Sequence, residues 1–78
     1  MTKEEANLVL QKLREGKQFS YGSYIAGVRY TYFYDPEKQA FAVREQDAYS
    51  DAEQVDYSSE EEMSETLQRN FRYDEITF

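Results

Sequence analysis

Carboxylates are the only abundant side chains in this sequence that could do chemistry, and they are concentrated in one stretch. Residues 45–65 hold nine of the 16 acidic residues and none of the nine Lys and Arg residues. The chain has no His and no Cys, so the usual general base, thiol nucleophile and zinc ligands are absent. Nucleophilic catalysis of the Ser-His-Asp or Cys-His type is therefore excluded.

Two kinds of carboxylate chemistry remain. Glycoside hydrolysis needs one carboxyl group that an apolar cleft keeps protonated, whereas the acids of residues 45–65 stand in polar runs. An EF-hand calcium loop needs ligands at alternate positions, Gly at position six and Glu at position twelve, a spacing that the acids between positions 47 and 56 do not follow. The sequence therefore favours a protein that is not an enzyme, with no catalytic residues, metal site or cofactor.

Two other segments could suggest nucleotide or RNA binding. Residues 22–27 contain two glycines but lack the Lys-Ser/Thr of a P-loop, and we expect them to form a turn between two strands. The aromatic run of residues 28–34 is similar to a base-stacking strand of an RNA-binding sheet. Only Arg29 and Arg44 accompany it, so we expect its tyrosines to face a core.

The remaining chemistry is recognition of a basic partner. Protein surfaces usually intersperse Lys and Arg among acids, but residues 45–68 contain neither. Two interpretations stay open: a solvated face that serves solubility and helix capping, and a face that binds a partner. On an extended strand, alternate carboxylates such as Asp51 and Glu53 would lie about 6.6 Å apart, near the spacing of phosphates along a nucleic-acid strand. Such a face would fit a basic nucleic-acid-binding groove.

The partner-binding interpretation assigns this face to six acids and to two tyrosines that would add packing contacts. The predicted residues are Asp47, Tyr49, Asp51, Glu53, Asp56, Tyr57, Glu61 and Glu65. Glu60 to Glu62 already have a structural role, because acids are favourable at the start of a helix. Phe33 is expected on the opposite face of a sheet and is a candidate for a secondary interface, where aromatic residues are enriched.

Two helices are expected to frame these residues. Each begins with a capping box, a Ser or Thr followed three residues later by Glu: Thr2 with Glu5, and Ser59 with Glu62. Apolar residues at helical spacing then predict helices over residues 3–15 and 60–71. Leu8 falls outside the apolar stripe of the first helix and is expected to be exposed.

Between the helices the hydrophobic period changes to two, which predicts strands. The expected strands are residues 17–21, 25–34 and 39–46, with a break at Gly22-Ser23, a turn at residues 35–38, a short optional strand at residues 52–57 and a last strand at residues 73–78. The turn would place Tyr32 opposite Phe41 and Tyr30 opposite Val43. It would also bring Arg29 near Arg44, an unfavourable pair unless carboxylates or a ligand lie between them.

The sequence thus predicts one α+β domain over residues 1–78, with both helices on one face of an antiparallel meander of three strands, or four if residues 52–57 join it. Eight tyrosines supplement a small set of aliphatic residues in its core. The expected core residues are Ala6, Val9, Leu10, Leu13, Phe19, Val28, Tyr30, Tyr32, Phe41, Val43, Val55, Met63, Leu67 and Phe71. No segment has the apolar length of a signal peptide or membrane span, so we expect a cytoplasmic monomer or homodimer that binds no membrane.

In size and charge the whole chain is similar to small acidic inhibitor proteins, among them phage anti-CRISPR proteins, other DNA mimics and toxin immunity proteins. The leading hypothesis is an inhibitor whose acidic face occupies the basic nucleic-acid-binding groove of a partner, in a phage anti-defence role, without touching nucleic acid itself. One alternative is an immunity or antitoxin protein that neutralises a basic toxin nuclease. Another is a structural adaptor that pairs through its open sheet face and C-terminal strand, using Phe33 and Phe78.

Overall fold

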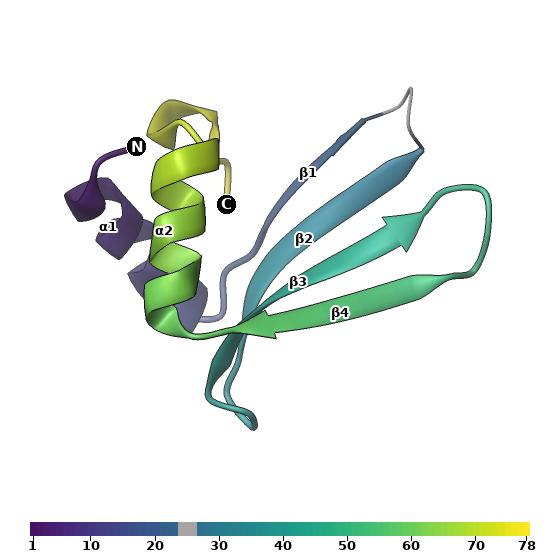
Figure 1. The fold of residues 1–78 in the computed structure, drawn as a ribbon, viewed down its shortest axis with the longest axis horizontal. Coiled ribbons are helices and arrows are strands. Elements are labelled where there is room, and N and C mark those ends of the chain that lie inside the picture. Colours follow the sequence, from purple (N-terminus) through teal and green to yellow (C-terminus); the bar gives the residue numbers. More distant parts are fainter. Residues whose placement is uncertain (24–26) are drawn as a thin grey trace.

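The computed structural model describes residues 1–23 and 27–78, which fold into a helix, an antiparallel sheet, a second helix and a short 3-10 helix (Figure 1). The strands are β1 (Phe19–Ser23), β2 (Val28–Asp35), β3 (Ala40–Asp47) and β4 (Glu53–Ser58), in that order across the sheet. The helices are α1 (Lys3–Arg14), α2 (Glu60–Asn70) and the 3-10 helix η1 (Tyr73–Glu75). The predicted α+β class is confirmed, and residues 53–58 do form the fourth strand.

Capping boxes begin both α-helices, as predicted. The Thr2 hydroxyl accepts a hydrogen bond from the Glu5 backbone N–H at 3.1 Å, and the Glu5 carboxylate accepts one from the Thr2 N–H at 2.9 Å. Ser59 and Glu62 exchange the same pair of bonds at the start of α2. These bonds satisfy backbone donors that have no partner inside a helix, so the short sequence signal places both helix starts correctly.

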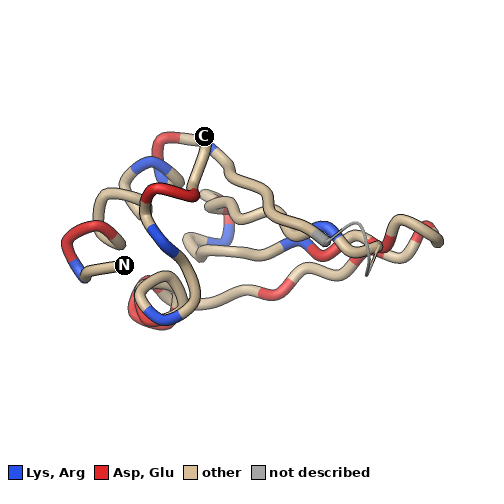
Figure 2. The backbone as a smooth tube through the Cα atoms, turned by 90° about the horizontal axis from the view of Figure 1, so that it is seen from above, with Lys and Arg blue, Asp and Glu red and all other residues tan. Residues whose placement is uncertain are grey.

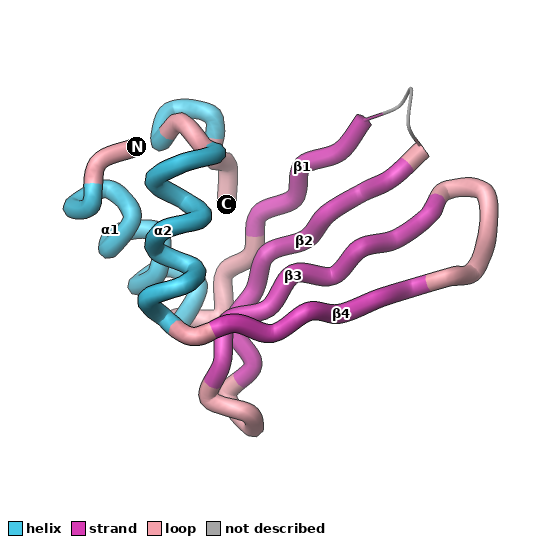
Figure 3. Tube along the Cα trace, viewed as in Figure 1, coloured by secondary structure: helices cyan, strands magenta, loops and turns pink. Residues whose placement is uncertain are grey.

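Both α-helices pack against the same face of the sheet and bury a core that is rich in aromatic rings (Figure 3). Phe19 and Tyr32 stack at 4.7 Å between ring centroids, and the edge of Phe71 meets both rings. The buried core side chains are Ala6, Val9, Leu10, Leu13, Phe19, Tyr32, Phe41, Met63 and Leu67. The strand ends nearest the β3–β4 loop extend beyond the helices, so that half of the sheet lies outside the core (Figure 3).

The register of the β2–β3 hairpin differs from the expected one by two residues. Tyr32 lies opposite Val43 and Tyr34 opposite Phe41. The reason is the loop, which runs from residue 36 to residue 39 because Gln39 adopts a left-handed conformation with φ 50°. A shift of two residues leaves every side chain on its expected face, so the predicted core survives the wrong register.

The predicted approach of Arg29 to Arg44 as cross-strand neighbours is wrong for the same reason. In the observed register Arg44 lies opposite Thr31, while Arg29 lies opposite Gln46. The two arginines still share the face away from the helices. A carboxylate from the neighbouring strand β4 compensates Arg44, as described below.

The break predicted at Gly22-Ser23 is also wrong, because both residues belong to β1. A Cβ atom on Gly22 would lie 2.9 Å from the Val28 carbonyl oxygen, so glycine here permits close approach of two strands rather than a turn. Strand β2 begins at Val28. The expected earlier start at residue 25, and the turn residues 24–26, lie outside the described residues.

The predicted C-terminal strand is wrong as well. Residues 73–75 form η1, and the guanidinium of the preceding residue Arg72 lies 3.2 Å from the Asp74 carboxylate and 3.9 Å from that of Glu75. The Phe78 ring meets the Phe19 ring edge-on at 6.0 Å. The tail therefore packs across the helix side of the sheet instead of pairing along a strand.

Most of the expected core residues are buried, and the exceptions are partly buried residues of the sheet and Phe71 at the end of α2. Val55 is half-buried on the face away from the helices. It lies opposite Arg44, and residues directly opposite each other on neighbouring strands point to the same face of the sheet. Val28 is half-buried near the end of the sheet that extends beyond the helices. Ala42 and Thr31 are buried on the helix-free face, which the hydrophobic pattern did not indicate.

We expect Leu67→Ala to lower the free energy of unfolding by about 2 to 5 kcal/mol, because it leaves a cavity in a fully buried site. The matched control is Leu8→Ala in α1, where the side chain is 49% exposed and truncation should cost less than about 0.5 kcal/mol. Urea unfolding followed by circular dichroism measures both. Equal losses for the two variants would contradict the assignment of the core.

Burial raises the pKa of the Tyr32 phenol above its ordinary 10.0, and Tyr21 and Tyr30 nearby raise it further. The folded state therefore holds this proton more tightly than the unfolded state does, so the associated stability is complete below about pH 10 and is lost as the pH rises through the folded pKa. We expect Tyr32→Phe to lose less stability in alkaline solution than the wild type, measured by urea unfolding. The control is Tyr73→Phe, and identical alkaline losses in all three proteins would contradict the prediction.

Candidate functional site

The predicted partner-binding residues come from three consecutive parts of the chain. Asp47 ends β3, and Tyr49 and Asp51 follow in the β3–β4 loop. Glu53, Asp56 and Tyr57 lie on β4, and Glu61 and Glu65 lie on α2. All eight are exposed. Figure 2 shows acidic segments along the strand that leads into α2 and at the start of that helix. We call the exposed carboxylates of residues 51–65 the acidic border.

The acidic border wraps around the edge of the sheet instead of forming one flat face. Glu53 and Tyr57 lie on the helix-free face, together with Val55. Asp56 lies opposite Val43, whose side chain packs on the core, so Asp56 is on the helix side. Asp51 lies in the bend before β4, and therefore the strand spacing expected between Asp51 and Glu53 does not occur.

Some acids of this stretch have structural partners. The Arg44 Nε atom lies 2.8 Å from the Glu53 carboxylate, although its N–H does not point at that oxygen. The Glu60 carboxylate accepts a hydrogen bond at 2.8 Å from the Arg14 guanidinium, which joins the two helices. Asp47 accepts the Tyr49 N–H at 2.9 Å and so shapes the loop. These acids stabilise the fold locally, and their charge is partly neutralised or used in a turn.

The other acids of the border lack a cation. Within residues 1–23 and 27–78, no Lys or Arg lies within 4.0 Å of the carboxylates of Asp51, Asp56, Glu61 or Glu65. Asp56 receives only the side-chain amide of Gln54, at 3.3 Å. Their negative charge is therefore presented to solvent. These four residues form the part of the predicted site that the local structure explains least.

The helix-free face has its own internal contacts. The Arg44 guanidinium lies over the Phe33 ring at 4.7 Å, and the Lys38 ammonium lies over the Tyr57 ring at 4.3 Å. Cation–π contacts of this kind cover both rings. Phe33 is half-buried under Arg44. Phe78 packs on the helix side, so these two phenylalanines do not share one surface.

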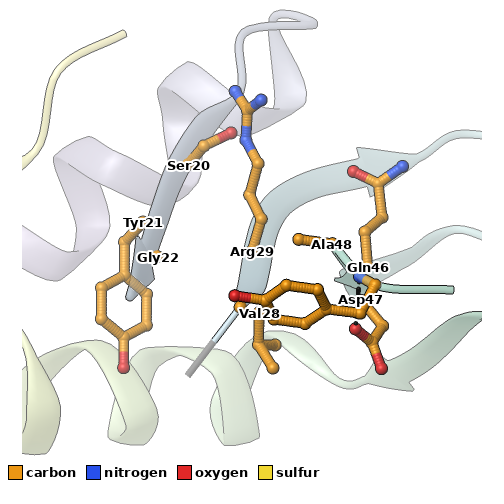
Figure 4. Close-up of a pocket in the computed structure, with 10 residues that line it drawn as sticks. Ser20, Tyr21, Gly22, Val28, Arg29, Gln46, Asp47 and Ala48 are labelled. Carbon is orange, nitrogen blue, oxygen red and sulfur yellow. Dashed lines mark hydrogen bonds between the residues drawn. The ribbon is translucent and has the colours of Figure 1, made fainter. Parts of the chain in front are cut away.

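A hollow of about 640 Å³ lies at the end of the sheet that extends beyond the helices (Figure 4). Its walls come from β1, β2, the end of β3 and the β3–β4 loop. The Tyr49 ring lies against Gly27, whose φ of +67° favours glycine. Arg29 and Tyr21 extend to opposite sides of the sheet (Figure 4). The polar groups of this hollow therefore diverge.

Among residues 1–23 and 27–78, no three Asp or Glu side chains converge in a group suited to holding a metal ion. No helix in these ranges is long and apolar enough to cross a membrane. Tyr49 is 81% exposed beside an otherwise polar loop, which is a geometry suited to contact with another macromolecule.

Sequence reasoning missed Arg44 as the cation of the border and missed the hollow beneath Tyr49. The like-charge conflict expected between Arg29 and Arg44 was the available signal for the first, since it called for a carboxylate nearby. The signal for the hollow was the pair of glycines, Gly22 and Gly27, that bound residues 22–27.

Comparison of the chain with protein-family models, with curated proteins and with solved structures gives no significant match.

Glu53→Gln should lower the free energy of unfolding by up to about 1 kcal/mol, because it removes the carboxylate charge next to Arg44 at a partly exposed site. The effect should shrink at high salt, which screens the ion pair. Asp51→Asn removes the same charge where no cation is in contact, and it should leave stability unchanged or slightly higher. Urea unfolding at low and high salt compares them, and a larger loss for Asp51→Asn would contradict the division between paired and free acids.

Proposed function

We propose that this protein is a non-enzymatic inhibitor that binds, through its acidic border, to the basic nucleic-acid-binding surface of another protein. The observation that carries the proposal is the set of exposed carboxylates without a cation, at Asp51, Asp56, Glu61 and Glu65. Helix capping accounts for Glu62, and ion pairs account for Glu53 and Glu60. Glu61 also favours the first turn of α2 through the helix dipole, although no cation contacts it among the described residues. A partner would account for the remaining free charges, those of Asp51, Asp56 and Glu65.

Electrostatics would give this interaction speed and selectivity. A concentrated negative surface attracts a basic groove over a distance of about 10 Å at 0.1 M salt and competes with the phosphates that the groove normally holds. Contact with side chains would supply the discrimination, and two exposed tyrosines are available for it: Tyr49 just before the border and Tyr57 within β4. Tyr57 is held by Lys38 and by a weak 3.5 Å hydrogen bond to Asp35, so little of its freedom would be lost on binding.

Two kinds of partner would suit this surface. One is a nucleic-acid-guided or nucleic-acid-cleaving enzyme of bacterial defence, for which the protein would be a phage anti-defence inhibitor of the anti-CRISPR type. The other is a basic toxin nuclease, for which it would be an immunity protein. Both use the same surface and the same competition with nucleic acid, so the next test addresses the shared mechanism.

We expect a triple variant, Asp56→Asn with Glu61→Gln and Glu65→Gln, to lose most of its binding to captured partners, because it removes three of the free charges. The immobilised protein would be incubated with cell lysate, and the captured nucleic-acid-binding proteins would be challenged with double-stranded DNA. Capture should fall with added DNA and with rising salt.

The matched control replaces Glu4 in α1, Glu15 at its C-cap and Glu75 in η1 with Gln, which changes the net charge by the same amount. It should retain capture. The proposal is wrong if DNA does not displace the captured proteins, or if the two triple variants lose capture equally.

A further inference from the structure

Strand β4 is an edge strand whose outer side faces solvent. It pairs with β3 through six consecutive residue pairs, from Gln46 with Glu53 to Phe41 with Ser58. In the described part of the chain the sheet order ends at β4, which forms one border of the sheet (Figure 1). Proteins commonly use a bulge or a proline to block an edge strand. The pairing of β4 with β3 contains no bulge, and β4 contains no proline. The edge is therefore regular enough to receive another strand.

One hydrogen bond shows which backbone groups of β4 point outward. The Asp47 N–H donates to the Ala52 carbonyl at 3.3 Å, which makes this pair a hydrogen-bonded one. Hydrogen-bonded and non-bonded pairs alternate along an antiparallel ladder. Gln54, Asp56 and Ser58 consequently direct their N–H and C=O groups toward β3. The outward groups belong to Glu53, Val55 and Tyr57.

The opposite edge of the sheet is less suited to strand addition. Strand β1 is five residues long and contains Gly22. The C-terminal tail also lies close to it, since the Phe78 ring packs on the Phe19 ring. Strand β4 is thus the more accessible edge.

Charge identifies the kind of strand that β4 would accept. A second copy of the chain would bring a second set of Glu53 and Asp56 carboxylates to the same edge, and each copy carries a net charge of −7, so self-pairing is disfavoured. On the helix-free face, Arg44 and Lys38 already contact Glu53 and Tyr57. On the helix side, Asp56 contacts no cation among the described residues, and the acidic first turn of α2 follows directly.

We propose that β4 binds an extended segment of a basic protein as a fifth strand, in which Lys or Arg residues alternate with apolar residues. The basic side chains face the side of Asp56, and the apolar ones lie beside Val55 and Tyr57. The alternation follows because successive residues of a strand point to opposite faces, and main-chain bonds to an edge give affinity while side chains give specificity. This inference rests on the proposed function and names its partner segment and binding mode.

The test uses two acetylated peptides of identical composition, one with Lys alternating with Val and Thr, and one with its Lys residues contiguous. Hydrogen exchange of the ¹⁵N-labelled protein is measured by NMR at a peptide concentration that occupies nine-tenths of the molecules. We expect the alternating peptide to slow exchange of the Glu53, Val55 and Tyr57 amides. When nine-tenths of the molecules are occupied, slowing should be about tenfold, because exchange occurs only from the free tenth. The contiguous peptide should leave these three amides unprotected.

Val55→Pro supplies a matched variant, because it removes an outward N–H without removing a bond to β3, and proline is tolerated at such edge positions. Its control, Val55→Ala, keeps the N–H. Binding of the alternating peptide should be lost in Val55→Pro and retained in Val55→Ala. Circular dichroism verifies that both variants fold, and the exchange measurement on the wild type requires no variant.

The outcomes separate this inference from the proposed function. Equal binding of both peptides without slowed exchange at the three amides would overturn strand addition, as would no binding of either, and neither result would affect DNA competition for captured partners. Conversely, protection of the three amides together with failed DNA competition would support strand addition and refute the inhibitor proposal.

Discussion

The pairing of β3 with β4 is the constraint on which the acidic part of this protein depends. It places Glu53 beside Arg44, sets Asp56 on the other face, and leaves the main chain of Val55 pointing outward. A shift of one residue would exchange the two faces of β4. Arg44 would then face its neighbours without the Glu53 charge, at a site where its Nε atom is already buried. The ion pair and the apolar contacts of β3 therefore support the same register.

The core supplies the rigidity that this edge needs. Both α-helices cover the half of the sheet that contains Phe41 and Tyr32, while the other half extends free (Figure 3). The Arg14 guanidinium, which lies 5.2 Å from the Phe41 ring, also binds Glu60 at the first turn of α2. One side chain thus connects α1, the core and the start of the acidic helix. The acidic border therefore begins at the end of the sheet that the helices leave uncovered and continues onto α2, which packs on the core.

Local sequence signals predicted the helices because capping boxes and apolar stripes act within a few residues. They also placed Tyr32 and Phe41 on the buried face, since strand alternation is local too. The hairpin register was missed because it depends on the left-handed conformation of Gln39, which no glycine or asparagine announces. The C-terminal residues alternate as a strand would, yet aromatic packing with Phe19 outweighs that pattern.

The candidate site was predictable as a composition but not as a surface. Nine acids without a basic neighbour are visible in the sequence of residues 45–65. Their division into paired and free groups depends on long-range contacts, above all on Arg14 with Glu60 and Arg44 with Glu53. The assignment of Asp56 to the helix side likewise required the β3–β4 register. These contacts shift the functional hypothesis from the whole stretch to its four free acids and to the edge of β4.

Chemical-shift mapping of the ¹⁵N-labelled protein, titrated with a purified captured partner, would test the central claim most directly. If the acidic border binds the partner, the amides whose chemical shifts change will fall within residues 51–65, and double-stranded DNA will reverse the changes. Changes confined to α1, or to the Phe33 region of the helix-free face, would contradict it.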